Sequence, residues 1–323
     1  MRALAMLHPP ASTAVTGHLR METMTNCTYY PYRSEAARDI CLQYFLAKAI
    51  REWPIASEEY TVPTAYGETF VRVSGPPGAP PLVLLHGAGA TSLMWTPNIQ
   101  ALSAGCRTFA VDQIGEFGRS LCTRPPRSLD DMMTWLNQLF DGLDLKGPVN
   151  LAGMSYGGAL AAQYALRSPQ RLSRLVLIAP GSTVLRLRAA FWMHVLVLAI
   201  GRRRGLAPFL RWVFPDMAQK DGSWINSIAE ELTLNMRSIQ RHHPPIPPVL
   251  TDAEWGSLRV RTLFLVGEHE VIYSPAKAVA RLKTVAPAIR REIVPGGGHD
   301  LTFASAGTVN QRILEFLRNE PAP

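Results

Sequence analysis

Two hydrophobic patterns alternate along the chain from about residue 58 onward. Short apolar or β-type runs predict eight strands, at residues 59–62, 69–74, 82–85, 107–111, 149–152, 174–179, 262–266 and 291–294. Segments with helical spacing lie between most of them or after the last, at residues 129–143, 156–167, 276–285 and 309–317. Continuous apolar runs are typical of strands buried on both faces. The alternation predicts an α/β fold, a mostly parallel eight-stranded sheet with helices on both faces.

The N-terminal part of the chain differs from this pattern. Residues 1–28 have no sustained period, which predicts a flexible extension. Ser34 then opens a helical stretch that Pro54 ends. We expect an amphipathic helix that packs on the main body. Its apolar face is expected to consist of Ile40, Tyr44, Ala47 and Ile50.

A long interval between the sixth and seventh expected strands contains only helical patterns broken by prolines. It predicts a helical cap over the carboxyl edge of the sheet, where ligands bind in open α/β folds. The expected division is a core at residues 29–180, a cap at 181–257 and the rest of the core at 258–323. The aromatic residues of the cap either line a substrate pocket or hold the cap down by packing. The candidate pocket residues are Trp192, Trp212 and Trp224.

Composition narrows the functional classes. The 323 residues are 47% hydrophobic and 18% charged, as expected of a folded chain, and the net charge of +8 includes no long basic run. Without a long basic run we expect no nucleic-acid partner. We also expect no stable membrane insertion, because the longest apolar run, 189–200, is too short to span a bilayer. The four cysteines form no CxxC pair, and the N-terminus is a poor signal peptide, so we expect reduced thiols, no metal and a cytoplasmic protein. A homodimer is left open.

The strongest chemical signal is the sequence GMSYGG around Ser155. It lies between the expected strand 149–152 and the expected helix 156–167, which is the setting of a nucleophile elbow. The tight turn would strain the serine backbone, and the flanking glycines would allow strand and helix to approach closely. Ser155 is therefore the expected nucleophile, and an ordinary glycine-rich turn is the alternative.

A serine hydroxyl needs a base to remove its proton. His299 follows the last expected strand and three glycines, at the edge where Ser155 should emerge, so we expect it to be that base. The base in turn needs a carboxylate on its other nitrogen. Glu270 is the expected partner, three residues beyond the glycine that ends the strand 262–266, and Glu268 is its rival.

An oxyanion hole is expected from two backbone N–H groups. One belongs to Tyr156 at the start of the helix after the elbow, and the other to Ala88 in the loop HGAGA after the strand 82–85. His86 in the same loop is expected to brace it rather than to act in catalysis.

With these motifs in place, the chain resembles the α/β-hydrolase superfamily over roughly residues 58–320. The motifs are HGAGA, VDQIGEFGRS, GMSYGG, LVLIAPG, GEHEVIY and PGGGH, in the family's order. The SGPPGAPPLVLLHGAGA stretch and the glutamate of GEHEVIY resemble bacterial carboxylesterases related to the naproxen esterase of bacilli. The resemblance implies no cofactor. A serine at position 155 argues against dehalogenases and epoxide hydrolases, which need a carboxylate there.

The leading hypothesis is a serine hydrolase that cleaves small to medium apolar carboxylic esters through an acyl-enzyme. The same triad could instead cleave a thioester, a lactone, an amide or a C–C bond. A ligand sensor that uses a hydrolase pocket without turnover is the alternative from another class.

Overall fold

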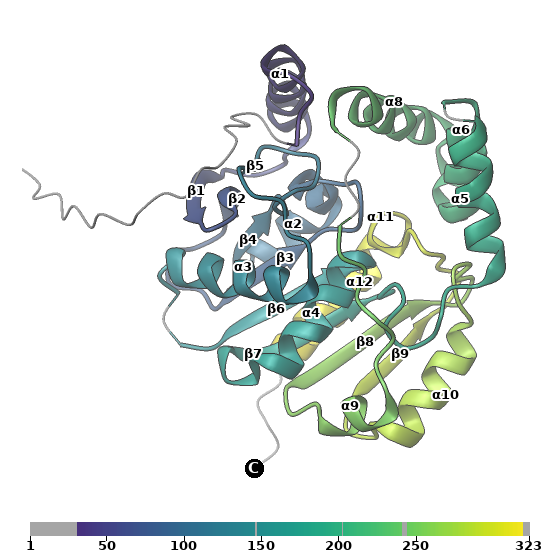
Figure 1. Ribbon diagram of the computed structural model, residues 1–323. Helices are drawn as coiled ribbons and strands as arrows, with labels where there is room; N and C mark the ends of the chain where they lie inside the picture. The colour runs from purple at the N-terminus through teal and green to yellow at the C-terminus, as the bar shows by residue number, and fades with distance from the viewer. Residues whose placement is uncertain (1–30, 146, 202, 241–243, 319–323) are drawn as a thin grey trace, which may run out of the picture.

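The computed structural model describes residues 31–145, 147–201, 203–240 and 244–318. Within these residues nine strands form one sheet in the order β1-β2-β4-β3-β6-β7-β8-β9, with β5 paired to β2 (Figure 1). Pairing is antiparallel where β2 meets β1, β4 and β5, and parallel from β4 to β9. The strands are β1 (Glu58–Thr64), β2 (Gly67–Ser74), β3 (Pro81–Leu85), β4 (Arg107–Val111), β5 (Leu121–Cys122), β6 (Val149–Met154), β7 (Leu172–Ile178), β8 (Arg261–Gly267) and β9 (Arg290–Val294).

The α/β-hydrolase fold predicted from the sequence is confirmed, with all eight expected strands present. The additional strand, β5, has only two residues and therefore leaves no recognisable hydrophobic pattern. The predicted extension at residues 1–28 lies outside the described residues.

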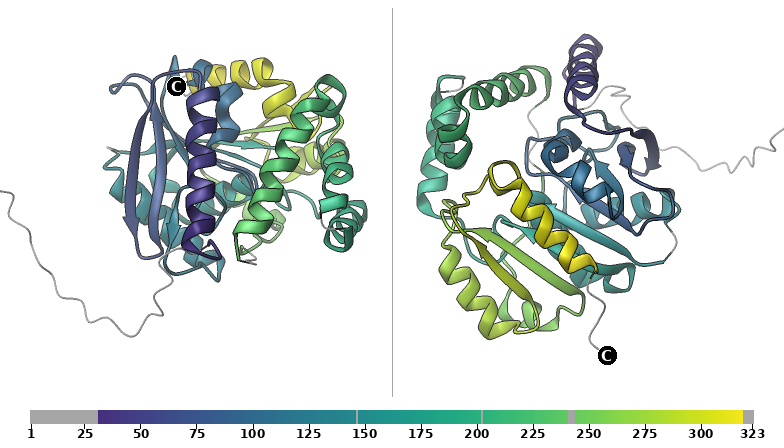
Figure 2. Two further views of the ribbon diagram at one scale, coloured as in Figure 1. Left: turned by 90° about the horizontal axis from the view of Figure 1, so that it is seen from above. Right: turned by 180° about the vertical axis from the view of Figure 1, so that it is seen from behind.

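Helices cover both faces of the sheet, as Figure 2 shows from two sides. Successive strand residues alternate between two cores: Val83 and Leu85 pack on one face, and Leu82 and Leu84 pack on the other. The first face carries α3 (Leu129–Gly142), α4 (Tyr156–Arg167), α9 (Asp252–Ser257) and α10 (Pro275–Val285), and the second carries α2 (Thr96–Ser103), α11 (Leu301–Ala304) and α12 (Ala306–Arg318). Short 3₁₀ turns lie at η1 (Ser92–Trp95) and η2 (Pro169–Arg171).

Helix α1 (Glu35–Glu52) forms where the sequence predicts it, with the Ser34 hydroxyl accepting a hydrogen bond from the Ala37 N–H at 3.2 Å. Its expected buried face was wrong. Ile40 and Ile50 are 57% and 78% exposed. The residues that α1 buries are Cys41, Phe45, Lys48 and Ala49. Phe45 packs edge-on against Phe117 of the core, so a long-range contact sets the rotation of the helix.

The interval between β7 and β8 is helical, as expected. It contains α5 (Ala189–Gly201), α6 (Arg203–Val213), α7 (Pro215–Lys220) and α8 (Gly222–Ser238) before α9. Figure 1 shows α5, α6 and α8 as an arm beyond the carboxyl ends of the parallel strands, with α8 reaching toward α1. Among the described residues, no helix combines the length and apolar character needed to cross a bilayer.

Candidate active site

Three loops at the carboxyl edge of the sheet bring the expected catalytic side chains together. Ser155 follows β6, Glu270 lies beyond β8, and His299 lies beyond β9. Because β6, β7, β8 and β9 are adjacent and parallel, these three loops open on the same edge. Residues 144 positions apart in the chain, Ser155 and His299, thereby come into contact.

The turn between β6 and α4 holds Ser155 in a conformation that side chains rarely adopt, with φ 51° and ψ −114°. Close backbone packing enforces it. A Cβ on Gly153 would lie 2.3 Å from the Gly157 carbonyl oxygen, and a Cβ on Gly157 would lie 2.4 Å from that of Leu85. Both glycines are needed because strand, turn and helix meet there without room for a methyl group.

The three side chains form one chain of contacts. His299 Nε2 lies 3.2 Å from Ser155 Oγ, and His299 Nδ1 lies 2.8 Å from Glu270 Oε2. The other Glu270 oxygen accepts a hydrogen bond from the Ile272 N–H at 2.9 Å, so the carboxylate is held at both oxygens. His299 and Glu270 are buried. This is the geometry of a nucleophile, a base and an orienting acid.

Glu268, the rival acid, is not part of this chain. It is exposed, and its carboxylate accepts the Gly296 N–H at 2.9 Å. The acid loop and the histidine loop are joined backbone to backbone, with the His269 N–H donating to the Gly297 carbonyl at 2.8 Å. A Cβ on Gly267 would lie 2.1 Å from that same oxygen, which explains why glycine ends β8.

The environment of His299 acts on its pKa in two directions. Burial lowers the pKa, but the charge of Glu270, the hydrogen bond to it and the charge of Asp300 outweigh burial, and the pKa lies above the ordinary histidine value. The charge of Glu270 therefore favours the protonated form of the His299 ring over the neutral form.

The two expected oxyanion donors lie beside the serine. Ala88 lines the same cavity as Ser155, and a Cβ on the preceding Gly87 would lie 3.5 Å from Ser155 Cβ. Tyr156 is the first residue of α4, where N–H groups have no acceptor within the helix. His86 supports the loop: its Nε2 accepts from the Gln113 N–H at 3.1 Å, and Nδ1 lies 2.8 Å from the Gly87 carbonyl oxygen.

Comparison with known proteins agrees with this geometry. A family model described as the alpha/beta hydrolase family matches residues 82–312. The chain belongs to this family. Carboxylesterase YbfK of Bacillus subtilis is 34% identical to this hydrolase over 286 residues, 87% of this chain and 96% of that protein.

Two solved structures extend the agreement. The crystal structure of carboxylesterase CesB (YbfK) from Bacillus subtilis covers 88% of the hydrolase and 100% of its own chain, with 33% identity and a TM-score of 0.79. The crystal structure of naproxen esterase from the same species covers 86% of the hydrolase and 98% of its own chain, with 31% identity and a TM-score of 0.77. The resemblance drawn from the motifs is thereby confirmed.

A cavity of about 520 Å³ opens beside Ser155 and His299. Of the three tryptophans expected in a pocket, Trp224 lines the cavity, whereas Trp192 and Trp212 do not. Trp192 is 52% exposed, and Trp212 stacks on His194 with ring centroids 4.1 Å apart. The expectation is therefore corrected at those two positions, because the rotation of α5 and α6 turns other aromatic residues inward. These are Phe191 and Phe209, joined by Phe214 at the start of α7.

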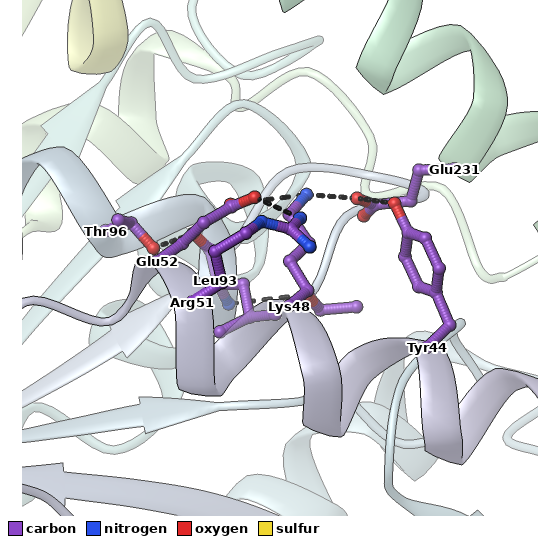
Figure 3. Close-up of polar contacts among 8 residues, drawn as sticks. Tyr44, Lys48, Arg51, Glu52, Leu93, Thr96 and Glu231 are labelled. Atoms are coloured by element: carbon purple, nitrogen blue, oxygen red, sulfur yellow. Dashed lines mark hydrogen bonds and ion pairs between the residues drawn. The ribbon is translucent and has the colours of Figure 1, made fainter.

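Sequence reasoning missed a charged group on the cavity wall. Lys48 and Glu52 of α1 and Glu231 of α8 all line the cavity, and Figure 3 shows them facing one another. The available signal was Lys48 itself, which follows Cys41 and Phe45 at helical spacing. The apolar spacing of Ile40, Tyr44, Ala47 and Ile50 instead predicts burial of a different face of α1, on which Lys48 does not lie.

Proposed function

We propose that this α/β hydrolase cleaves carboxylic esters through an acyl-enzyme intermediate. The observation that carries the proposal is the continuous contact from Ser155 through His299 to Glu270. The relatives named carboxylesterases, similar over most of their length, support the same bond type.

In the proposed reaction, Ser155 Oγ attacks the ester carbonyl carbon while His299 Nε2 takes the hydroxyl proton. The backbone N–H groups of Ala88 and Tyr156 donate to the oxyanion that forms. His299 returns the proton to the leaving alkoxide, and the acyl group stays on Ser155. A water molecule, deprotonated by His299, then releases the acid and regenerates the serine.

The cavity supports a small to medium, largely apolar substrate. Most of its lining is apolar, including Met94, Met154, Val213, Ile228 and Leu232, and it includes the aromatic residue Trp224. We propose the helices within residues 181–257 as the cap that sets specificity, because several of these side chains belong to them.

The decisive experiment uses p-nitrophenyl butyrate. Ser155→Ala should abolish turnover, while Ser173→Ala, which changes an exposed serine of β7, should retain it. A serine-directed phosphonate should add its mass to the peptide that contains Ser155. Unchanged turnover by Ser155→Ala, or a label on another serine, would remove the assignment.

A wider assay tests the competing readings of the same site. Ester, thioester, lactone, amide and ring-fission dienone substrates are compared with the same enzyme. Faster turnover of one of the other classes would move the activity away from esters. A burst of product without steady-state turnover would favour a ligand sensor.

A cytoplasmic location and a homodimer also belong to the proposal. Buried thiols at Cys41, Cys106 and Cys122 are compatible with a reducing compartment. Helix α5 offers an apolar surface for a second copy of the chain. Its exposed residues are Trp192, Met193, Leu196, Val197 and Ile200. Sedimentation velocity of the wild type and of Leu196→Lys tests the dimer.

A further inference from the structure

The cavity beside Ser155 has a polar group on an otherwise mostly apolar wall. Besides Ser155 and His299, its polar lining includes two threonines whose hydroxyls are used locally: Thr96 donates to the Leu93 carbonyl at 2.8 Å, and Thr91 accepts from the Leu93 N–H at 3.3 Å. Apart from the Trp224 indole, the other polar side chains that the described residues contribute to the lining are Lys48, Glu52 and Glu231. We call these three residues the charged wall.

The charged wall joins α1 to α8 (Figure 3). Lys48 Nζ donates to Glu231 Oε2, and Glu52 Oε2 lies 4.0 Å from the same ammonium. Tyr44 donates to Glu231 Oε2 at 3.4 Å, and burial together with the charge of Glu231 raises the pKa of this phenol, which keeps its proton. Both side chains of the Lys48–Glu231 pair are 9% exposed.

The backbone holds the two helices in place. Beyond the end of α8, the Gln240 N–H donates to the Pro31 carbonyl at 2.7 Å, and ahead of α1 the Arg33 N–H donates to the Ser238 carbonyl at 2.8 Å. The charged wall is therefore fixed before a substrate enters, which lowers the entropy cost of binding to it.

A buried ion pair is weak evidence for stability, because well-packed apolar residues of similar volume often serve as well or better. The surrounding contacts make an apolar alternative feasible, since α1 and α8 also meet through Phe45 and Leu234 in one hydrophobic cluster. Charged residues at a cavity wall instead suit recognition of a polar substrate group.

The charges and hydrogen bonds of the charged wall indicate which kind of polar substrate group it would bind. The positive charges of Lys48 and Arg51 balance the negative charges of Glu231 and Glu52. Lys48 pairs with Glu231, and Arg51 pairs with Glu52 at 2.7 Å. A charged substrate end would therefore meet no uncompensated counter-charge. Lys48 and Tyr44 both donate to Glu231 Oε2, and among the described residues no hydrogen bond reaches Oε1.

We infer that Glu231 Oε1 accepts a hydrogen bond from an uncharged donor, a hydroxyl or an amide N–H, at the end of the ester substrate remote from the scissile bond. This inference rests on the proposed esterase function and names the substrate class within it. The preferred substrates are then apolar esters that end in such a donor. A neutral donor reaches the free oxygen without breaking the Lys48–Glu231 pair.

The test compares p-nitrophenyl esters of ω-hydroxy acids with plain esters of matched length, at six, eight and ten carbon atoms. A second series places the hydroxyl on the alcohol side, as ω-hydroxyalkyl acetates against alkyl acetates. The measured quantity is the hydroxyl ratio, kcat/KM of the hydroxy ester over that of the plain ester, each corrected for spontaneous hydrolysis. A hydrogen bond to a charged acceptor predicts a ratio of roughly ten to a hundred at the best length.

Variants separate recognition from a structural role. The double variant Lys48→Met/Glu231→Leu should bring the hydroxyl ratio to about one, and Glu231→Gln, which keeps the shape, should lower it. Arg38→Met is the matched control, a cation on the same helix that pairs with Asp39 and does not line the cavity, and it should leave the ratio unchanged.

Each outcome decides between defined alternatives. A wild-type ratio near one at every length in both series overturns the inference, as does a ratio that the double variant and Glu231→Gln leave unchanged. A purely structural pair would slow both esters equally and so preserve the ratio. A preference for ω-ammonium or ω-carboxylate esters would overturn the donor class. Absence of turnover with plain and hydroxy esters alike would instead refute the proposed esterase function.

Discussion

Replacing Glu270 by glutamine tests the site most sharply, because the change keeps the size of the side chain and removes its charge. The Ile272 N–H, 2.9 Å from Oε1, requires an acceptor, so the glutamine carbonyl oxygen should take that position. The amide NH₂ then faces His299 Nδ1, 2.8 Å away in the wild type. The ring must accept there and carry its proton on Nε2, where it can no longer accept one from Ser155.

The wrong tautomer should lower kcat by roughly 10³ to 10⁴ fold, which corresponds to about 4 to 5.5 kcal/mol of transition-state stabilisation. The pH profile changes as well. Wild-type activity requires neutral His299 and should rise through an apparent pKa above the ordinary histidine value. In Glu270→Gln the charge that raises this pKa is gone while burial remains, so the residual activity should begin at lower pH.

The assay is kcat and kcat/KM for p-nitrophenyl butyrate between about pH 5 and about pH 9, with unfolding transitions recorded to show that each variant is folded. Glu268→Gln is the matched control, two residues away on the same loop. It should retain wild-type kinetics because the Glu268 carboxylate is exposed and accepts the Gly296 N–H rather than a bond from His299. A large loss in Glu268→Gln together with a small one in Glu270→Gln would refute the assignment of the acid.

Three further predictions concern the elbow, the cavity and a buried carboxyl group. Gly157→Ala places a methyl group 2.4 Å from the Leu85 carbonyl oxygen and should lower the free energy of unfolding by about 2 kcal/mol or more, measured with urea, whereas Gly201→Ala, with nothing within 4 Å, should not. Trp224→Ala removes a cavity wall and should lower kcat/KM for p-nitrophenyl hexanoate roughly tenfold, while an equal loss in Trp192→Ala would contradict the placement of these side chains. Burial raises the pKa of Asp300 to about 6 from 3.8, so wild-type stability should decline as pH rises between these values. Asp300→Asn keeps an acceptor for the Met217 N–H, 2.7 Å away, and should remove the part of the stability decline that comes from ionisation of Asp300. Identical urea midpoints in wild type and variant at each pH would refute the raised pKa of Asp300.

Much of the fold was predictable because its determinants are local. The apolar runs of β3, β6, β7 and β8 are buried on both faces, and their short length and flanking turn residues distinguish them from longer apolar helices such as α5. The turn around Ser155 was equally readable, since Gly153 and Gly157 are required by backbone contacts that any elbow of this kind makes.

Contacts between distant segments decided the remainder. Helical spacing in α1 allows more than one apolar face, and packing of Phe45 on Phe117 selected the face that places Lys48 at the cavity. The choice between Glu268 and Glu270 required the position of His299, which follows a different strand. Among the tryptophans of α5, α6 and α8, the rotation of each helix decided which one lines the cavity.

The sequence by itself thus determined the elements, their order and the chemical groups at the ends of the parallel strands, because spacing and turn residues act over a few positions. Only the tertiary structure decided which side chains meet across the cavity, because helix rotation depends on partners far away in the chain.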